Sequence, residues 1–328
     1  MSHPTSMSTS TSKDAPPTTQ GSWYALLTVA ITAFALVTSE FLPIGVLNSI
    51  AADLNISPGT AGLVITLPGI MAALAAPLLP VWVKQLDRRY LLIGLTAIMV
   101  LANLITALSH SFALLLFSRF FLGIAIGGFW ATAIALSGKL APPHLPIAKA
   151  TAIVMAGVTL ATVLGVPIGT WLSEFLGWRT AFLITAGIGA LVIVLELIYL
   201  PVLKPEAAIH LRDLPALLRE SKARKGLIII LLLGLAHFSS FSFLAPFFKD
   251  VAHFSGTTIS SLLLLYGIFG IFGNAFAGYS GNLNVRYTFA FIGLCFAVVY
   301  FAFPIFAIQL PGAVILTALL GFAFGAIP

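Results

Sequence analysis

The chain has 328 residues, of which 59% are hydrophobic and only 8% are charged, and its formal net charge is +6. Soluble domains contain about 25% charged residues, so this composition excludes a soluble globule and indicates an integral membrane protein. The apolar residues fall in blocks of about twenty, which is the length of a membrane-spanning helix. They do not alternate as in a transmembrane barrel. The predicted fold class is therefore all-α and membrane-embedded.

Residues 1–21 are rich in Ser, Thr and Pro and predict a disordered tail. The apolar blocks that follow predict ten spans, near 23–47, 61–83, 90–109, 112–138, 148–171, 179–201, 226–248, 259–280, 287–306 and from 311 onward. The last block stops at Pro328 without a polar flank or a basic anchor. A helix end inside the bilayer would leave carbonyls without partners, so we expect a chain truncated in its tenth span.

The longest polar connector lies between spans six and seven and divides the chain into two halves. The predicted units are a six-helix bundle, a cytoplasmic linker and a second bundle of four spans, at 22–201, 202–225 and 226–328. Two short similarities, between 87–94 and 285–293 and between 56–60 and 254–258, relate the halves at an offset near 198. Repeated six-span units, with substrate held between them, are common among secondary transporters. Chance similarity between apolar segments is the alternative.

The distribution of basic residues predicts the orientation. If the amino terminus is cytoplasmic, only Arg179 and Lys249 lie in outer loops and Arg119 lies within a span, which leaves thirteen of the sixteen Lys and Arg residues in inner segments. The positive-inside rule therefore predicts a cytoplasmic amino terminus. We expect a multi-pass protein of a bacterial inner membrane. Because no basic run with interleaved aromatics occurs outside the membrane, nucleic acid is not an expected partner.

Arg119 is a charged residue within the apolar span 112–138. A guanidinium stays protonated and costs several kcal/mol in hydrocarbon unless a partner or water is supplied, so Arg119 is a candidate functional residue. Glu40 has the same predicted depth, roughly 10 Å below the outer surface. Burial favours a neutral carboxyl while a nearby guanidinium favours a carboxylate, so conformation or substrate can switch the proton on Glu40. The alternative for Glu40 is snorkelling or structural pairing.

Three further polar residues lie within spans. Glu196 is close to the inner end of span six, where we expect it to reach water, and it is the weaker candidate for proton exchange. His237 can titrate near neutral pH, although a neutral, hydrogen-bonded histidine is the favoured interpretation. The single cysteine, Cys295, allows neither a disulfide framework nor a zinc cluster. No metal and no cofactor are expected.

Two segments have the composition of moving parts. Asp87 and Arg88 follow span two, where a carboxylate can bridge helix ends as a conformational latch; an ordinary solvated turn is the alternative. Span five contains small residues and a proline, which permit close helix approach and a bend. Generic packing is the alternative for this predicted hinge, which comprises Gly157, Gly165, Pro167 and Gly169.

Span seven contains a run of rings and hydroxyls, including His237, Phe241 and Ser242. Rings can stack on a planar ligand and hydroxyls can bind its polar edge, so this run predicts one wall of a substrate cavity. Aromatic residues that face lipid are the alternative.

Several of these features together resemble the major facilitator superfamily. The resemblance rests on Arg119 with Gly123 and Gly127, on the glycines of span five and on Asp87-Arg88. Within the family the chain is similar to twelve-span proton-coupled antiporters, in the branch that exports nucleosides and sugars. The stretches that resemble this branch are 40–43 (EFLP), 87–90 (DRRY), 127–130 (GGFW) and 177–179 (GWR).

The resemblance implies two pseudo-symmetric six-helix bundles, the second incomplete here. It also implies that Arg119 governs proton transfer, that Glu40 is the protonation site, that Asp87 and Arg88 form the latch, and that span five is the hinge. Trp130, in the GGFW stretch, joins the predicted cavity residues. The chain departs from the family pattern at Val83, Tyr90, Leu91 and Leu92 near the latch, and at Val166 and Thr170 in span five.

The resulting hypothesis is a monomeric secondary transporter that exports a small organic solute in exchange for protons. Two bundles would rock around a central cavity whose substrate is a nucleoside, a sugar or a drug-like molecule. A uniporter or importer on the same fold is the first alternative. A channel or a membrane-embedded enzyme is disfavoured, because the sequence has no filter-like repeated loop, no paired carboxylates and no His-Glu-x-x-His motif.

Overall fold

The computed structural model describes residues 21–83, 86–203 and 219–327. Nearly all of the predicted tail and most of the predicted linker therefore lie outside the described residues. Throughout the described ranges the regular elements are helical and no strand occurs. This architecture agrees with the predicted all-α fold.

The amino-terminal half begins with α1 (Trp23–Asp53), the short α2 (Pro58–Ala61), α3 (Leu63–Trp82), α4 (Arg88–Leu108) and α5 (Phe112–Leu140). Span five is divided into α6 (Ile147–Leu160), a π-helical turn η1 (Ala161–Gly165) and α7 (Val166–Leu176). The half ends with α8 (Trp178–Tyr199). The carboxy-terminal half contains α10 (Ser221–Pro246), a second π-helical turn η2 (Phe247–Val251), α11 (Gly256–Phe306) and α12 (Leu310–Ala326).

Polar side chains at the helix starts explain several of these boundaries. The hydroxyls of Ser22, Ser111 and Ser255 accept hydrogen bonds from backbone N–H groups three residues later. At the start of α4 the Asp87 side chain accepts from the N–H of Arg89, two residues later, over 2.8 Å. In hydrocarbon every backbone polar group needs an internal partner, so a long apolar run between such caps forms a continuous helix.

Seven helices within the described ranges are long and apolar enough to cross a membrane, and α12 is a shorter apolar helix. One of the seven, α11, has 51 residues, or ~75 Å, which is far more than one span needs. Its backbone leaves the helical region at Asn284, where φ is −161° and ψ is 102°. The Asn284 side chain accepts from the N–H groups of Arg286 and Tyr287, so it ends one span and caps the next. Spans eight and nine therefore lie within α11.

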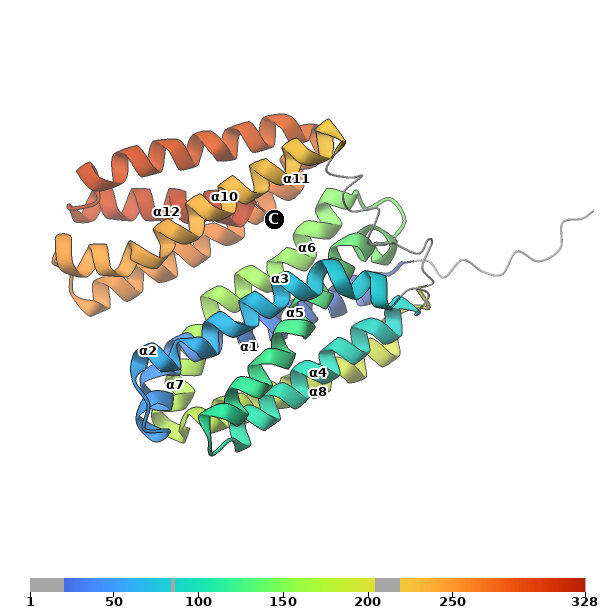
Figure 1. Cartoon of the computed structure of the whole chain (residues 1–328). Helices are drawn as coiled ribbons and strands as arrows, with labels where there is room; N and C mark the ends of the chain where they lie inside the picture. The colour runs from blue at the N-terminus through green and yellow to red at the C-terminus, as the bar shows by residue number, and fades with distance from the viewer. Residues whose placement is uncertain (1–20, 84–85, 204–218, 328) are drawn as a thin grey trace, which may run out of the picture.

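The helices form two bundles that lie side by side (Figure 1). The amino-terminal bundle contains α1 to α8 and the carboxy-terminal bundle contains α10 to α12, and each has its own apolar core. Packing of α6 against α11 joins the bundles. In this contact the Asn274 side chain donates to the carbonyl of Ala152 over 2.7 Å, and Val163 of the adjoining turn η1 lies directly over Gly267.

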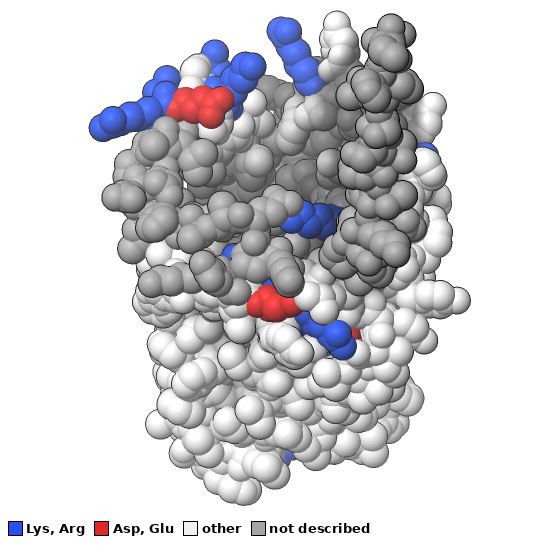
Figure 2. All heavy atoms as spheres, turned by 90° about the vertical axis from the view of Figure 1, so that its right-hand side faces the viewer, with Lys and Arg blue, Asp and Glu red and all other residues white. Residues whose placement is uncertain are grey.

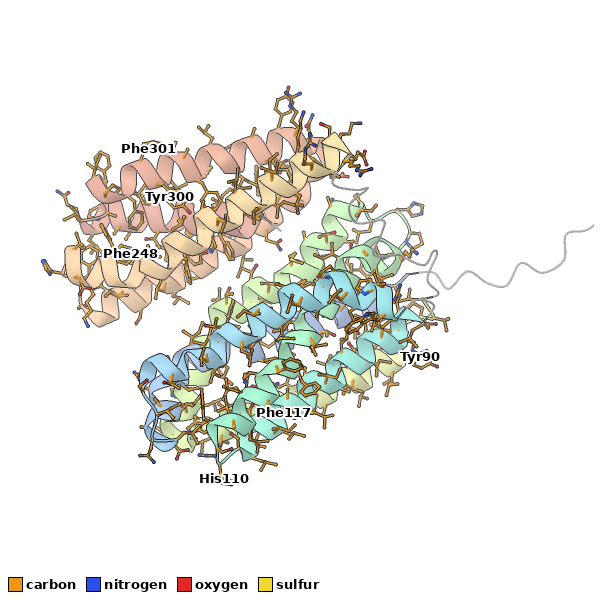
Figure 3. The ribbon with its side chains drawn as sticks, viewed as in Figure 1. Tyr90, His110, Phe117, Phe248, Tyr300 and Phe301 are labelled. Atoms are coloured by element: carbon orange, nitrogen blue, oxygen red, sulfur yellow. The ribbon has the colours of Figure 1, made fainter. Side chains whose placement is uncertain are left out.

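The two ends of the molecule differ in charge. Figure 3 labels Tyr90 and His110 at opposite ends of α4, and we name these the Tyr90 end and the His110 end. Figure 2 looks onto the Tyr90 end and shows basic side chains in several places. The described basic residues of this end are Arg88, Arg89, Lys139, Lys149, Arg219, Lys222, Arg224, Lys225 and Arg286.

At the His110 end of the described chain the only Lys or Arg residues are Arg179 and Lys249. Arg179 pairs with Asp53, donates to the carbonyl of Ser109 over 2.9 Å, and lies 4.3 Å from the ring centroid of Trp178. These contacts join the ends of α1 and α4 to the start of α8.

Candidate functional site

Buried polar side chains form two clusters inside the amino-terminal bundle. Thr32 and Ser39 on α1, and Thr96 and Asn103 on α4, are each seven residues apart and fully buried. Seven residues are nearly two helical turns, so each pair shares one helix face at levels about 10 Å apart. One level contains Arg119 and the other contains Glu196.

The arginine cluster consists of Arg119, Ser39, Asn103, Thr106 and Ser118, all of them 0% exposed. The Arg119 guanidinium donates from Nη1 to the carbonyl of Ser39 over 3.1 Å and from Nη2 to the hydroxyl of Thr106 over 2.7 Å. Its carbon lies 4.7 Å from the ring centroid of Phe182. The charge is therefore held by neutral dipoles and an aromatic face.

Further hydrogen bonds extend this cluster. The hydroxyls of Thr106 and Ser118 lie 2.7 Å apart, and the Asn103 side chain donates to the Ser39 hydroxyl over 2.8 Å. Within the described structure, Arg119 Nε and Asn103 Oδ1 are buried without hydrogen-bond partners. Buried polar atoms without partners are costly, so they make this cluster a candidate functional site.

Glu40 lies at the level of the arginine cluster but makes no ion pair with Arg119. The guanidinium binds the carbonyl of Ser39, the residue immediately before Glu40. Glu40 itself is partly exposed, and none of the hydrogen bonds or ion pairs between described residues involves its carboxyl. The structure thus places the two charges at one depth without direct contact. Their predicted communication stays a prediction.

The glutamate cluster consists of Glu196, Thr32 and Thr96. Glu196 is 0% exposed, and its Oε1 lies 3.0 Å from the Thr32 hydroxyl and 2.9 Å from the Thr96 hydroxyl. Its Oε2 is buried without a partner among the described atoms. The expectation that Glu196 reaches water was wrong, because α8 turns this side chain toward α1 and α4.

The residues of the predicted latch bind within one bundle. Asp87 Oδ1 accepts from the N–H of Leu203 over 2.9 Å, and the N–H of Arg88 donates to the Leu203 carbonyl over 3.0 Å. The Arg89 guanidinium donates to the carbonyl of Leu197. These contacts join the start of α4 to the end of α8, and the role of Asp87 and Arg88 as a latch remains a prediction.

The predicted hinge coincides with a change of helical geometry. A Cβ at Gly157 would lie 2.1 Å from the carbonyl oxygen of Ala30, so only glycine allows α6 to approach α1 this closely. The π-helical turn η1 follows and ends two residues before Pro167, whose ring nitrogen has no N–H for a helical hydrogen bond. The side chains of Gly165, Pro167 and Gly169 lie outside the described set.

The π-helical turn also separates two sets of neighbours. Before it, α6 packs on α1 and on α11 of the other bundle; after it, α7 packs on α1 and α8 of its own bundle. Span five therefore contacts the other bundle through α6 and through the π-helical turn that follows it. Its function as a hinge remains a prediction.

The predicted cavity residues fall in different places. Trp130 is partly buried and its ring packs edge-on against Phe129, with centroids 5.1 Å apart. His237 is 1% exposed, stacks on Phe324 at 3.8 Å and has Nε2 3.3 Å from the Tyr266 hydroxyl. Phe241 is 39% exposed on the next turn of α10. The Ser242 side chain lies outside the described residues.

Rings form much of the carboxy-terminal core. The Tyr300 hydroxyl donates to the carbonyl of Ala236 over 2.9 Å, and Phe248 is fully buried. Figure 3 shows both within this bundle, whereas Phe301 lies on its outer side and is 82% exposed. The rings of span seven thus contribute to packing, and the cavity assignment of Trp130, His237, Phe241 and Ser242 stays a prediction.

A cavity of about 210 Å³ lies where α6, α11 and α12 meet. Its lining combines apolar side chains with Thr151, Asn274 and Thr288. Trp130, His237 and Phe241 do not contribute to it. Among the described residues, no group of three or more His, Cys, Asp or Glu side chains is placed to hold a metal ion.

Comparisons with known proteins place this geometry in a family. Residues 29–328 match the family described as Major Facilitator Superfamily. The purine ribonucleoside efflux pump NepI of Escherichia coli (strain K12) is 31% identical over 280 residues, which cover 85% of this chain and 70% of the relative. The transcription regulatory protein OpdE of Pseudomonas aeruginosa is 34% identical over 261 residues, covering 78% and 65%.

A solved structure has the same fold. The crystal structure of the human organic anion transporter MFSD10 (TETRAN) superposes with a TM-score of 0.71, covers 95% of this chain and 84% of that chain, and is 18% identical in sequence. The predicted family resemblance and fold class are confirmed. This chain belongs to the major facilitator superfamily.

Proposed function

We propose that this transporter exports a small organic solute in exchange for protons by alternating access. The observation that carries the proposal is the buried Arg119 guanidinium, which binds the backbone next to Glu40 inside a membrane bundle. A buried charge in this position is costly, and its presence therefore indicates a function. A carboxyl beside it can gain or lose a proton at moderate cost. The name of the 31% identical relative, an efflux pump, supports the outward direction.

In this proposal Glu40 exchanges the proton and Arg119 sets the balance between its two states. Hydrogen bonds fix the guanidinium to Ser39 and Thr106, while no described partner fixes the Glu40 carboxyl. A carboxylate at Glu40 is favoured when the guanidinium is near, and the neutral acid is favoured when the helices separate them. Rearrangement of α1 against α5 therefore changes the affinity of Glu40 for its proton.

The orientation of the protein is part of the proposal. The basic residues of the Tyr90 end support a cytoplasmic location for that end, since cytoplasmic segments are enriched in Lys and Arg. Bacterial relatives support the inner membrane. The latch at Asp87 and Arg88 would then lie on the cytoplasmic side, and Asp53 with Arg179 on the outer side.

The two bundles supply the moving bodies of the proposed mechanism. Each has its own core, and α6 with α11 forms the contact about which they could rock. The change of partners at the π-helical turn supports a bend in span five. Such a bend would let α7 stay packed on its own bundle while α6 moves together with α11.

The proposed substrate is a small molecule with a planar or polar ring, of which purine nucleosides are the first candidates because of the relative's name. Sugars and amphipathic drugs are the other candidates. A growth-inhibition and export screen of cells that overexpress the gene, covering nucleoside analogues, sugars and common antibacterials, would identify the class.

The proton coupling is tested with everted membrane vesicles that contain the wild-type protein or the Glu40→Gln variant. We expect a pH gradient to drive uptake of the exported solute by the wild type, and we expect Glu40→Gln to lose this dependence. Glu220→Gln, which changes an exposed carboxyl, is the matched control. If Glu40→Gln transports with an unchanged pH dependence, Glu40 is not the coupling carboxyl. If the wild type ignores the gradient, a uniporter is indicated instead.

A further inference from the structure

We infer that the Glu196 carboxyl, enclosed by the hydroxyls of Thr32 and Thr96 inside the amino-terminal bundle, is a second proton-binding site of the protein. Its use in transport rests on the proposed proton coupling. Glu196 lies on α8, which contributes the Phe182 ring to the site proposed at Glu40 and Arg119. The inference adds a separate site, about two helical turns along α1 from Glu40.

The two hydroxyls have alternative acceptors. The Thr32 hydroxyl lies 3.0 Å from Glu196 Oε1 and 3.0 Å from the carbonyl of Thr28. The Thr96 hydroxyl lies 2.9 Å from Glu196 Oε1 and 3.1 Å from the carbonyl of Leu92. Each hydroxyl has one proton, so each donates in one of these directions at a time.

Rotation of the hydroxyls alone can therefore provide Oε1 with hydrogen-bond partners in both protonation states of Glu196. When Glu196 is a carboxylate, both hydroxyls turn toward Oε1. When Oε1 has a proton, it donates to one threonine oxygen, and that hydroxyl turns to the carbonyl four residues earlier. No heavy atom has to move, which is a property expected of a site that gains and loses protons repeatedly.

The second carboxyl oxygen favours the neutral state as the resting state. Oε2 is buried without a partner among the described atoms. In a carboxylate this oxygen shares the negative charge, and a buried charge without donors is far more costly than a buried neutral carbonyl oxygen. Glu196 therefore holds a proton until the helices around it open.

The guanidinium groups of Arg89 and Arg119 contact other groups. On α4, the Arg89 guanidinium donates to the Leu197 carbonyl, one residue after Glu196, and the backbone N–H of Arg88 bonds to Leu203. At the other level, Arg119 is held by Ser39 and Thr106. The remaining charged or titratable residues on α8 and on the helices packed against it are Tyr24, Glu40 and Asp53 on α1, Tyr90 on α4, Arg179 and Tyr199 on α8, and Glu174 on α7.

None of these residues is a hydrogen-bond partner of the Glu196 carboxyl in the described structure, and the Glu174 side chain lies outside it. The site thus consists of a carboxyl and neutral donors. Loss of the proton to water at the Tyr90 end would leave a negative charge one residue from the backbone that Arg89 binds. We expect the Arg89 guanidinium to turn toward that charge, which would release the Leu197 carbonyl at the joint between α4 and α8.

Infrared difference spectroscopy of the protein in lipid vesicles tests the inference directly, because a protonated buried carboxyl has its own C=O stretching band. We expect a band at neutral pH that is lost in Glu196→Gln and retained in Glu220→Gln, an exposed control. Thr96→Val should shift the same band, because it removes one of the two hydroxyls that contact Oε1 without changing the size of the side chain. The Thr32→Val variant should also shift it, because it removes the other hydroxyl.

A band that survives unchanged in Glu196→Gln would overturn the inference, as would wild-type spectra that show only the carboxylate. If Glu196→Gln does not fold, the band shift in Thr96→Val decides, since an unshifted band would mean that the proton is elsewhere. The proposed function fails separately: wild-type export that ignores a pH gradient refutes proton coupling, while the Glu196 band still shows where a proton binds.

Discussion

The two bundles stabilise their interiors by different means. The amino-terminal bundle buries a guanidinium and a carboxyl among hydroxyls, Arg119 at one level and Glu196 at the other. The described interior of the carboxy-terminal bundle contains no buried Asp, Glu, Lys or Arg, and it is built largely of stacked rings such as His237, Tyr266 and Phe324. The difference suggests a division of labour, in which proton chemistry belongs to the first bundle and shape and packing to the second.

The largest expected effect comes from removing the buried cation. Arg119→Leu should abolish solute export, because it deletes both charge-assisted hydrogen bonds and leaves the Thr106 hydroxyl without its donor. Arg119→Lys keeps the charge but cannot reach Ser39 and Thr106 together, and we expect at least about a tenfold loss of rate, since each such hydrogen bond is worth ~1.5–3 kcal/mol. Vesicle transport, corrected for the amount of protein in the membrane, measures both.

Arg286→Leu, which removes an exposed cation of the carboxy-terminal bundle, is the control for Arg119 and should transport normally. Normal export by Arg119→Leu would remove the basis for assigning proton chemistry to the first bundle.

A smaller effect is expected from the close approach of α6 to α1. Gly157→Ala places a Cβ 2.1 Å from a backbone oxygen, so the helices must move apart, at a cost of about 1–3 kcal/mol in stability. Gly187→Ala on α8 meets open space and should be neutral or slightly stabilising. Thermal unfolding in detergent compares the two. Equal unfolding temperatures for both variants would show that this contact does not hold the bundle together.

The smallest effect is expected in the aromatic core. His237→Phe keeps a ring against Phe324 and loses the contact with the Tyr266 hydroxyl, so we expect a loss of about 1 kcal/mol in stability. The pH dependence of export should stay as in the wild type, because the proposed proton sites are in the other bundle. A changed pH profile in this variant would assign part of the proton chemistry to the second bundle.

The helices could be predicted from the sequence because the bilayer itself fixes their length. Apolar blocks of about twenty residues correspond to the observed helices, including the two spans that α11 joins at Asn284. Arg119 could also be identified, since an arginine in such a block has few alternatives to a function or a buried partner. Cap residues such as Asp87 could be recognised in the sequence for another reason, which is that a cap acts on its own helix end.

The partners inside the bundle could not be predicted in this way. Matching depth suggested Glu40 as the partner of Arg119, but depth does not fix direction, because adjacent residues on a helix point roughly 100° apart. The acceptor in the structure is the carbonyl of Ser39. Whether Glu196 faces water or the core depends on Thr32 and Thr96, which are 164 and 100 residues away along the chain. The sequence did contain one sign of the buried polar clusters, the seven-residue spacing of Thr32 and Ser39. This spacing indicates clusters only together with the same spacing on a second helix.

The hairpin at Asn284 has a mechanical consequence. A single residue with extended backbone joins the two halves of α11, and the hydroxyls of Ser280 and Thr288 are hydrogen-bonded across it over 3.1 Å. The first half touches α6 of the other bundle, while the second half contains Tyr300, which is bonded to the backbone of α10. The connection between the two spans of α11 is therefore as short as one residue. It links the contact between the bundles to α10 along one continuous stretch of chain.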